Sequence, residues 1–292
     1  MRTAVFTAIY PAAKPFLDEY FAALKSQTES KYELFLVADS IDQPEIFLSP
    51  HLKSLKSPWS VHPASGTPPQ IRKQGITEAI KQGFEALIFA DIDDRMAPNR
   101  VEVSREYLSR NSILVNEVLL VGKNLNSPVS FLKPRFRDGQ KIGFSDIKAG
   151  NCLGLSNTAI LTKCLETVDF PEIPDYLVAF DWALYFQLLH RGEFALFTDK
   201  TWTEYRQHDQ NCASPIDWSP LQIQQNLETK YSFYRYAAKF DKSFQNWVRI
   251  FEKLIAEIRK NPQFLDRYVE VLRARAPANP LWWENIQPWE FS

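Results

Sequence analysis

Apolar, β-branched runs alternate with helical stretches at the start of this chain, and this alternation constrains the fold more than any other feature. Residues 3–10 and 32–38 have the length and composition of buried strands. Between them, the apolar residues of 15–27 recur at the spacing of a helix with one buried face. Strand, helix and strand joined by short turns form a βαβ unit, whose two strands run parallel. We therefore predict an α/β protein built on a parallel sheet.

The same pattern continues up to a short acidic segment. Residues 71–82 are predicted to be helical, with Gly83 at the position of a C-terminal cap. A third strand is predicted over 84–90, and it ends directly at Asp91. The intervening residues 42–69 are rich in proline and show little periodicity, so we expect an irregular connection across the surface.

The next part of the sequence combines strands and helices with longer polar stretches. Residues 182–190 are apolar almost all round, which is typical of a buried helix. Residues 126–149 are polar and irregular. The other predicted elements are helices over 98–110 and 156–166 and strands over 115–121 and 194–197.

Strand patterns are absent after about residue 218. Apolar residues within 244–258 form a one-sided helical stripe, which either packs on the protein's own core or offers a surface for self-association, a partner or a membrane face. We place a domain boundary near residue 215. The prediction is an α/β domain over 1–215 and a helical C-terminal extension over 216–292.

Charge and composition argue against several classes of protein. With 34 basic and 35 acidic side chains, the chain has no broad attraction for nucleic acid. No apolar run approaches the roughly 18 residues of a membrane span. The 3 cysteines are widely spaced and make neither a disulfide framework nor a zinc pattern, which favours the reducing cytoplasm. The apolar start is interrupted by Pro11 and is more typical of a buried strand than of a signal peptide.

An acidic segment, Asp91-Ile92-Asp93-Asp94, follows the third predicted strand. In open α/β sheets, ligands bind beyond the carboxyl ends of the strands, so these carboxylates stand where a ligand is expected. Neighbouring carboxylates repel each other by about 1 kcal/mol in water and about 4 kcal/mol near a partly shielded surface. A divalent cation such as Mg²⁺ or Mn²⁺ would compensate this repulsion. A solvated acidic turn that caps the next helix is the alternative interpretation.

Four further polar residues occupy positions suited to a site, and each has a structural alternative. Asp39 ends the second strand, where it could bind a nucleotide or cap a turn. Arg72 begins a helix and could pair with the acidic segment, pair with a phosphate or lie on the surface. Asp181 precedes the buried helix as a general base or as an N-cap. His208, in a polar loop, is either a metal or phosphate ligand or a solvated side chain.

Taken in order, these segments resemble the family 2 glycosyltransferases of the GT-A fold. The pieces that carry the resemblance are VFTAIY, LFLVADS, IRKQGITEAIKQG, ALIFADIDD, FDWALYFQLLHRG and YRQHDQN, and together they extend over residues 3–212. The resemblance implies a Rossmann-like GT-A sheet with helices on both faces. It also implies an enzyme that binds nucleotide-sugars, with the acidic segment as its DXD motif.

The resemblance also implies roles for individual residues. The donor-binding residues would be Thr7, Ala8, Tyr10, Asp39, Arg72, Asp91, Ile92 and Asp93. Within this set, Thr7, Ala8 and Tyr10 would border the nucleotide, and Asp39 would contact its base. Asp91 would reach the ribose side, Asp93 and Asp91 would hold Mn²⁺ or Mg²⁺ together with His208, and Asp181 would be the catalytic base.

The chain departs from the family pattern at two positions. Phe180 stands where the family carries an acidic residue before the base, and residues 38–41 replace a more acidic turn that contains glycine. These departures affect the geometry between base and acceptor and the identity of the nucleotide more than they affect the fold.

The function implied by the resemblance is transfer of a sugar from a UDP- or dTDP-linked donor to the hydroxyl of a glycan or lipid-linked acceptor, with inversion, in surface polysaccharide biosynthesis. The 126–149 segment would face the acceptor or act as a lid. We expect a cytoplasmic protein, either free or peripheral to the inner face of the membrane. Two alternatives stay open: a nucleotidyltransferase, although the residues after the first strand lack glycine, and a non-catalytic GT-A-like binding or scaffold protein.

Overall fold

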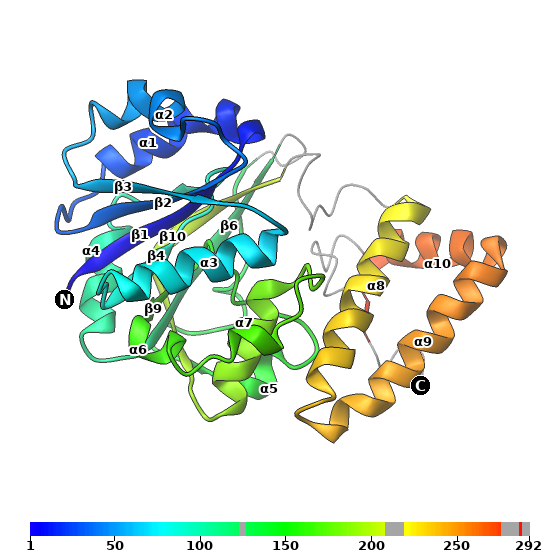
Figure 1. The fold of residues 1–292 in the computed structure, drawn as a ribbon. Helices are drawn as coiled ribbons and strands as arrows, with labels where there is room; N and C mark the ends of the chain where they lie inside the picture. The colour runs from blue at the N-terminus through cyan, green and yellow to red at the C-terminus, as the bar shows by residue number, and fades with distance from the viewer. Residues whose placement is uncertain (123–126, 208–218, 276–285, 288–292) are drawn as a thin grey trace.

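The structure is a computed structural model, and it describes residues 1–122, 127–207, 219–275 and 286–287. These residues form a 10-stranded sheet with helices on both faces, followed by a group of helices at the C-terminal end (Figure 1). The strand order is β3-β2-β1-β4-β9-β6-β10-β5, with β7 paired to β6 and β8 paired to β10.

The first half of the sheet is parallel, as the βαβ pattern predicts. Its strands are β1 (Thr3–Ile9), β2 (Glu33–Asp39), β3 (Trp59–Ala64) and β4 (Ala86–Phe89). Strand β1 lies between β2 and β4 and is parallel to both, and β2 is parallel to β3. The carboxyl ends of these four strands therefore meet at one edge of the sheet, which we call the rim.

The second half of the sheet is mixed. Strand β9 (Thr158–Leu161) lies between β4 and β6 (Ile113–Gly122) and is antiparallel to both. Beyond it, β6 is parallel to β10 (Ala195–Gln207). The remaining strands are short: β5 (Arg95–Met96), β7 (Val129–Ser130) and β8 (Lys141–Ile142).

Side chains of β1 alternate between two hydrophobic cores, as expected for a strand buried on both faces. Val5 and Ile9 pack with residues of α1 (Leu17–Lys25), α2 (Pro44–Leu52) and α4 (Arg100–Leu108). Ala4 and Phe6 pack on the other face with residues of α3 (Pro68–Lys81) and α7 (Phe180–His190). Short helices α5 (Phe144–Ile147) and α6 (Thr162–Leu165) and the 3-10 turns η1 (Pro11–Phe16) and η2 (Phe170–Glu172) complete this part.

Helix α3 approaches the sheet closely because of a glycine. A Cβ atom on Gly75 would lie 2.5 Å from Val37 Cγ2 and 2.7 Å from Phe6 Cζ, so a larger residue would push the helix away. The helix begins with a capping box in which Thr67 and Gln70 satisfy each other's backbone amides. These two features fix where Arg72 lies relative to the rim.

Two of the predicted elements are wrong, and a third is longer than predicted. Residues 42–69 contain α2 and β3 rather than an irregular connection, because β3 is an edge strand, where Pro63 removes no essential hydrogen bond. Residues 156–166 begin with β9 rather than a helix, since the four residues of this strand are too few to show a period of two. The strand predicted over 194–197 extends to Gln207 through a register shift between Thr198 and Trp202.

The C-terminal helices pack against the α/β part rather than standing apart from it. They are α8 (Pro220–Ala237), α9 (Gln245–Lys260) and α10 (Pro262–Arg275), with the turn η3 (Lys242–Phe244) between the first two. The ring of Phe233 on α8 stacks on Trp182 of α7 with centroids 3.7 Å apart. The apolar stripe predicted over 244–258 faces inward, because Phe251, Leu254 and Ile258 are buried.

Residues 208–218 lie outside the described residues, so the domain boundary near 215 stays a prediction. Among the described residues, none of the helices combines the length and the hydropathy needed to cross a membrane.

Candidate functional site

Strand β1 brings the first three candidate residues to the rim with different orientations. The side chain of Thr7 is fully buried, and its hydroxyl is hydrogen-bonded to the hydroxyl of Tyr20. Ala8 and Tyr10 are partly exposed near the end of the strand. The Asp91 charge contributes to the raised pKa of Tyr20, so the pair formed by Thr7 and Tyr20 lies within electrostatic range of the acidic segment. Because the side chain of Thr7 is fully buried, any contact of this residue with a ligand would involve its backbone.

Asp39 is the last residue of β2, and its side chain is partly exposed. Its Oδ1 accepts a hydrogen bond of 2.8 Å from Ser40 Oγ. Ser40 has a φ of 53°, a left-handed conformation that favours glycine. At residues 38–41 the chain therefore places a serine in a backbone conformation that glycine would adopt without strain.

Arg72 and Asp91 meet across the rim. Arg72 Nη2 on α3 lies 4.0 Å from Asp91 Oδ1, just after β4, and both side chains are partly exposed. The Arg72 guanidinium lowers the pKa of both Asp91 and Asp181, so it is within electrostatic range of both carboxylates. The pairing of this arginine with the acidic segment, one of the predicted alternatives, is confirmed.

Three of the four candidate carboxylates form one electrostatic cluster, and Asp39 is not among the charges that shift the pKa of Asp91 or Asp181. The pKa of Asp91 is raised to about 6, first by burial and then by the charges of Asp93 and Asp181, while Arg72 lowers it. Asp91 and Asp93 follow β4, whereas Asp181 lies in the first turn of α7, about ninety residues later in the chain. The fold thus brings together Arg72, Asp91, Asp93 and Asp181, which we call the acidic cluster. Ile92 is buried between the two aspartates and faces the core.

The Asp181 carboxylate is held by its surroundings. Its Oδ1 accepts a 2.8 Å hydrogen bond from the backbone amide of Trp182. Burial raises the pKa of Asp181, while Arg72, the amide of Trp182 and the side chain of Asn151 lower it. A Cβ atom on Gly154 would lie 3.8 Å from Asp181 Oδ2, so the backbone of 151–154 forms the wall beside this oxygen. An oriented, partly buried carboxylate of this kind is suited to accept a proton.

Three residues of the site were not identified from the sequence. Asn151 and Gly154 contact Asp181 from a loop about thirty residues away, and neither belongs to a motif that marks this contact. Asp94 was visible as part of the acidic segment, but its role was not. It is buried, and its Oδ1 accepts a 3.0 Å hydrogen bond from the amide of Arg206 near the end of β10. Burial, Asp93 and Asp91 raise the pKa of Asp94.

The donor set at the rim fits a divalent cation bound together with a phosphate ligand. Within the described part of the chain, no group of three or more His, Cys, Asp or Glu side chains is arranged to hold a metal ion by itself. His208, the third predicted ligand, lies outside the described residues. Mg²⁺ is commonly held by one or two carboxylates, waters and substrate phosphates, which matches Asp91 and Asp93. Burial contributes most to the raised pKa of Asp91, and the negative charges of Asp93 and Asp181 add to it; a cation bound between the carboxylates would offset that repulsion.

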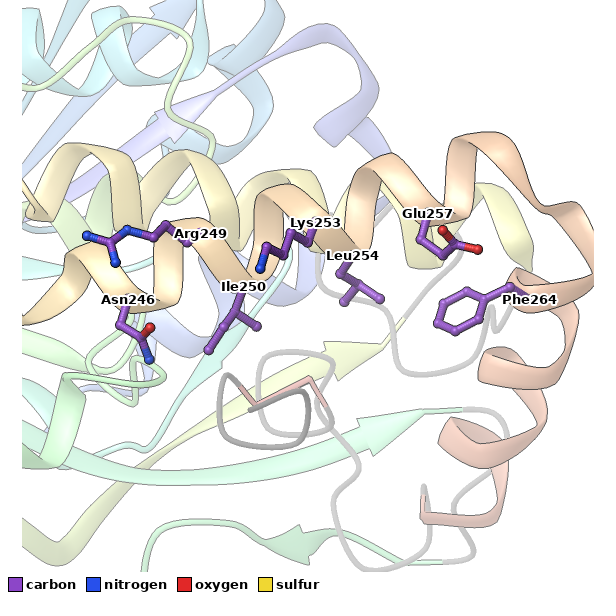
Figure 2. A pocket seen from close by; sticks show the side chains of 7 residues that line it. All are labelled: Asn246, Arg249, Ile250, Lys253, Leu254, Glu257 and Phe264. Carbon is purple, nitrogen blue, oxygen red and sulfur yellow. The ribbon is translucent and has the colours of Figure 1, made fainter.

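A groove of about 610 Å³ lies elsewhere, on the C-terminal helices (Figure 2). Its walls are Asn246, Arg249, Ile250, Lys253, Leu254 and Glu257 of α9 together with Phe264 of α10. Two cations and one carboxylate line it, so it has no counterpart of the acidic cluster. The candidate site is therefore the rim rather than this groove.

No family model matches the sequence, and no curated protein matches it. Solved structures do match in fold. S. aureus TarS 1-349 in complex with UDP-GlcNAc has a TM-score of 0.57 at 15% identity, over 98% of this chain and 89% of that one. The mannosyltransferase PcManGT from Pyrobaculum calidifontis, in complex with GDP-Man and Mn²⁺, has a TM-score of 0.58 at 14% identity, over 95% and 76%.

GalNAc-T7 with UDP, GalNAc and Mn²⁺ has a TM-score of 0.58 at 13% identity, over 86% of this chain and 50% of that one. The chain spans 44% of the longer TarS structure that it also matches. These similarities, together with the mixed sheet and its helices, show that the chain has the GT-A fold with additional C-terminal helices.

Proposed function

We propose that this protein is a divalent-cation-dependent glycosyltransferase that moves a sugar from a nucleoside-diphosphate donor to an acceptor hydroxyl. The observation that carries the proposal is the acidic cluster, which joins the ends of β4, α3 and α7 at the rim of a GT-A sheet. Similar folds have been solved with UDP, UDP-GlcNAc and GDP-Man, and two of them with Mn²⁺.

In this proposal, the donor half of the site is formed by β1, β2, β4 and α3. Ala8, Tyr10 and Asp39 border the nucleoside, and Asp91 and Asp93 hold Mn²⁺ or Mg²⁺. The bound cation would neutralise the charge between these carboxylates and the diphosphate and stabilise the leaving group. Arg72 can pair with a phosphate in place of Asp91, since a guanidinium binds either anion.

Asp181 is the proposed general base. Its carboxylate accepts the proton of the acceptor hydroxyl while the hydroxyl oxygen bonds to the anomeric carbon and the bond from that carbon to the diphosphate breaks. A single in-line displacement of this kind inverts the anomeric centre. The hydrogen bond from the Trp182 amide keeps the carboxylate oriented for proton transfer.

The nucleotidyltransferase alternative fits the structure less well. The segment after β1 is the 3-10 turn η1, which contains Pro11 and Pro15 and lacks glycine. It therefore does not form the glycine-rich phosphate loop that we expect of such enzymes.

The proposal also includes a UDP- or dTDP-linked donor and a glycan or lipid-linked acceptor. It further includes a role in surface polysaccharide biosynthesis and a cytoplasmic, membrane-peripheral location.

An assay of nucleoside diphosphate release tests the proposal. The protein is incubated with UDP-, dTDP- and GDP-sugars and Mn²⁺. We expect Asp181→Asn to lower the rate by about 10²–10⁴-fold, the usual contribution of a general base, without weakening UDP binding. Asp266→Asn, at an exposed position of α10, is the matched control and should leave the rate unchanged. Pyrophosphate release from a nucleoside triphosphate, or equal rates for Asp181→Asn and the wild type, would contradict the proposal.

A further inference from the structure

The loop that leads into α7 carries two exposed apolar side chains, and Asp181 of the acidic cluster lies in the first turn of the helix that follows. Tyr176 is 69% exposed and Val178 is 57% exposed. Among the large hydrophobic side chains of the described residues, that of Tyr176 is the most exposed. They precede Asp181 by five and three positions. Apolar groups exposed together beside a reactive group commonly mark a binding surface.

This loop is packed into the protein, so the exposure of the two side chains is not the result of a loose segment. Ile173 and Leu177 are buried in the same core as α7. The amide of Leu177 donates a 3.0 Å hydrogen bond to the carbonyl of Pro174, and the amide of Phe180 donates one of 2.9 Å to the carbonyl of Val178. Buried residues and short turns therefore hold Tyr176 and Val178 outward.

Asp175 fastens the loop to α3. Its Oδ1 lies 2.6 Å from Lys73 Nζ, its Oδ2 accepts a 2.8 Å hydrogen bond from Gln70 Nε2, and its carbonyl accepts one of 2.9 Å from Thr67 Oγ1. Arg72, the residue before Lys73 on α3, is paired with Asp91. The helix that holds the loop therefore also contributes to the acidic cluster. Tyr176 thus lies between the start of α3 and the start of α7.

We propose that Tyr176 and Val178 form a platform that binds a sugar ring of the acceptor; this inference rests on the proposed function. The reacting hydroxyl must come within hydrogen-bond distance of Asp181. Five residues of chain span at most about 17 Å, so a glycan acceptor whose hydroxyl reaches Asp181 can also cover Tyr176. A tyrosine offers an apolar ring face and a polar hydroxyl, which matches the C–H face and the hydroxyl groups of a sugar ring.

Charge favours a neutral sugar over an anionic membrane surface at this position. Asp175 and Glu172, exposed just before the platform, are paired with Lys73 and Lys239, so the charge of these carboxylates is balanced. Attraction to a membrane of anionic lipids relies on an excess of basic side chains, which these pairs do not provide. A paired carboxylate can still accept hydrogen bonds from sugar hydroxyls.

Ligand-observed NMR tests the platform directly. Methyl glycosides of glucose, galactose, mannose and N-acetylglucosamine, and the corresponding disaccharides, are added to the full chain with UDP and Mg²⁺. We expect saturation transfer from the wild type to at least one of these sugars, a loss of about tenfold or more in apparent affinity for Tyr176→Ala, and near wild-type binding for Tyr176→Phe, which keeps the ring. Val178→Ala should give a smaller loss.

The outcomes separate this inference from the proposed function. Calorimetry of UDP with Mg²⁺ tests the donor site and should give equal affinities for the wild type and Tyr176→Ala. If UDP binds but no sugar gives a signal, or if the sugar signal is the same in Tyr176→Ala, the platform is wrong while the donor site stands. Binding of the wild type to anionic lipid vesicles that is lost in Tyr176→Ala would also overturn the platform. Absence of UDP binding in all variants would count against the proposed function instead.

Discussion

Two neighbouring residues of α7 belong to two different regions of the molecule. Asp181 lies at the rim of the sheet, and Trp182 lies in the contact between α7 and the C-terminal helices. Asp181 faces the acidic cluster, where partly buried carboxylates repel each other. Its neighbour Trp182 faces the other way and packs on Phe233 of α8, while its indole Nε1 donates a 2.8 Å hydrogen bond to the carbonyl of Ile147. One region is electrostatically unfavourable without a ligand, and the other is well packed.

This difference suggests a way in which the molecule can hold the proposed site without losing its fold. Carboxylates placed close together destabilise the folded state, and that cost is typical of binding and catalytic sites. The aromatic cluster around Phe233, which includes Phe186, Tyr234 and Phe244, supplies apolar burial immediately behind the proposed base. Substitutions in the two regions should therefore change stability in opposite directions.

The largest expected effect on stability is that of Phe233→Ala. The side chain is fully buried and stacked on Trp182, so truncation should lower the free energy of unfolding by about 3–5 kcal/mol. Phe240→Ala, at a ring that is 40% exposed, is the control and should cost less than half as much. Urea denaturation measures both. Equal effects for the two variants would show that α8 contributes little to holding α7.

Asp91 should give the opposite result, and its effect should depend on pH. Because its pKa is raised to about 6 in the folded protein, the folded state binds the extra proton more readily than the unfolded state. This contribution to stability is present at low pH and is lost as the pH rises through 6. We expect Asp91→Asn to reduce this decline but not to abolish it, because the pKa values of Asp94 and Asp181 are raised as well. Urea denaturation from about pH 4.5 to about pH 7.5 measures the decline in both proteins.

Ligand binding should respond to pH in the other direction. Binding of UDP with Mn²⁺ requires ionised carboxylates, so it should weaken as the pH falls below about 6. A decline in stability that is the same in Asp91→Asn and the wild type, or nucleotide binding that strengthens on acidification, would contradict the placement of this carboxylate in the cluster.

The smallest expected effect is that of Tyr185→Phe, which removes a buried hydrogen bond of 2.5 Å from the Tyr185 hydroxyl to Thr158 Oγ1. Thr158 Oγ1 also donates to the carbonyl of Gly154, so Tyr185 supports the loop beside Asp181. We expect a loss of about 1 kcal/mol in the free energy of unfolding and unchanged UDP affinity. Tyr231→Phe, at a half-buried position of α8, is the control. A stabilising effect of Tyr185→Phe would place this hydroxyl among the unfavourable groups of the rim.

Elements with a strong local pattern were predictable from the sequence. Strands β1, β2 and β4 and helices α1, α3 and α7 follow from apolar periodicity, although their bounds differ by a few residues. Strand β3 could not be recognised, because an edge strand that contains Pro63 and has a half-buried face shows no alternation. Strand β9 could not be recognised either, since four residues between two stronger strands carry too little pattern.

The site was predictable only where it coincides with the ends of elements. Asp91 follows a buried strand, Arg72 lies in the first turns of a helix and Asp181 begins a buried helix, so position alone indicated them. Asn151 and Gly154 meet Asp181 through a tertiary contact, and Asp94 bonds to an amide more than a hundred residues away. Contacts of this kind depend on the packed structure and leave no local pattern in the sequence.

The central claim is that the acidic cluster binds a nucleoside diphosphate through a divalent cation, and calorimetry tests it most directly. UDP, GDP and dTDP are titrated into the wild type with Mn²⁺ and with EDTA, and then into Asp93→Ala and the exposed control Asp266→Ala. We predict binding of at least one of them to the wild type and to the control only when Mn²⁺ is present, and a loss of about 100-fold or more in Asp93→Ala, as expected when a metal ligand is removed. Equal affinity in Asp93→Ala and the wild type, or equal affinity with and without Mn²⁺, would contradict the account.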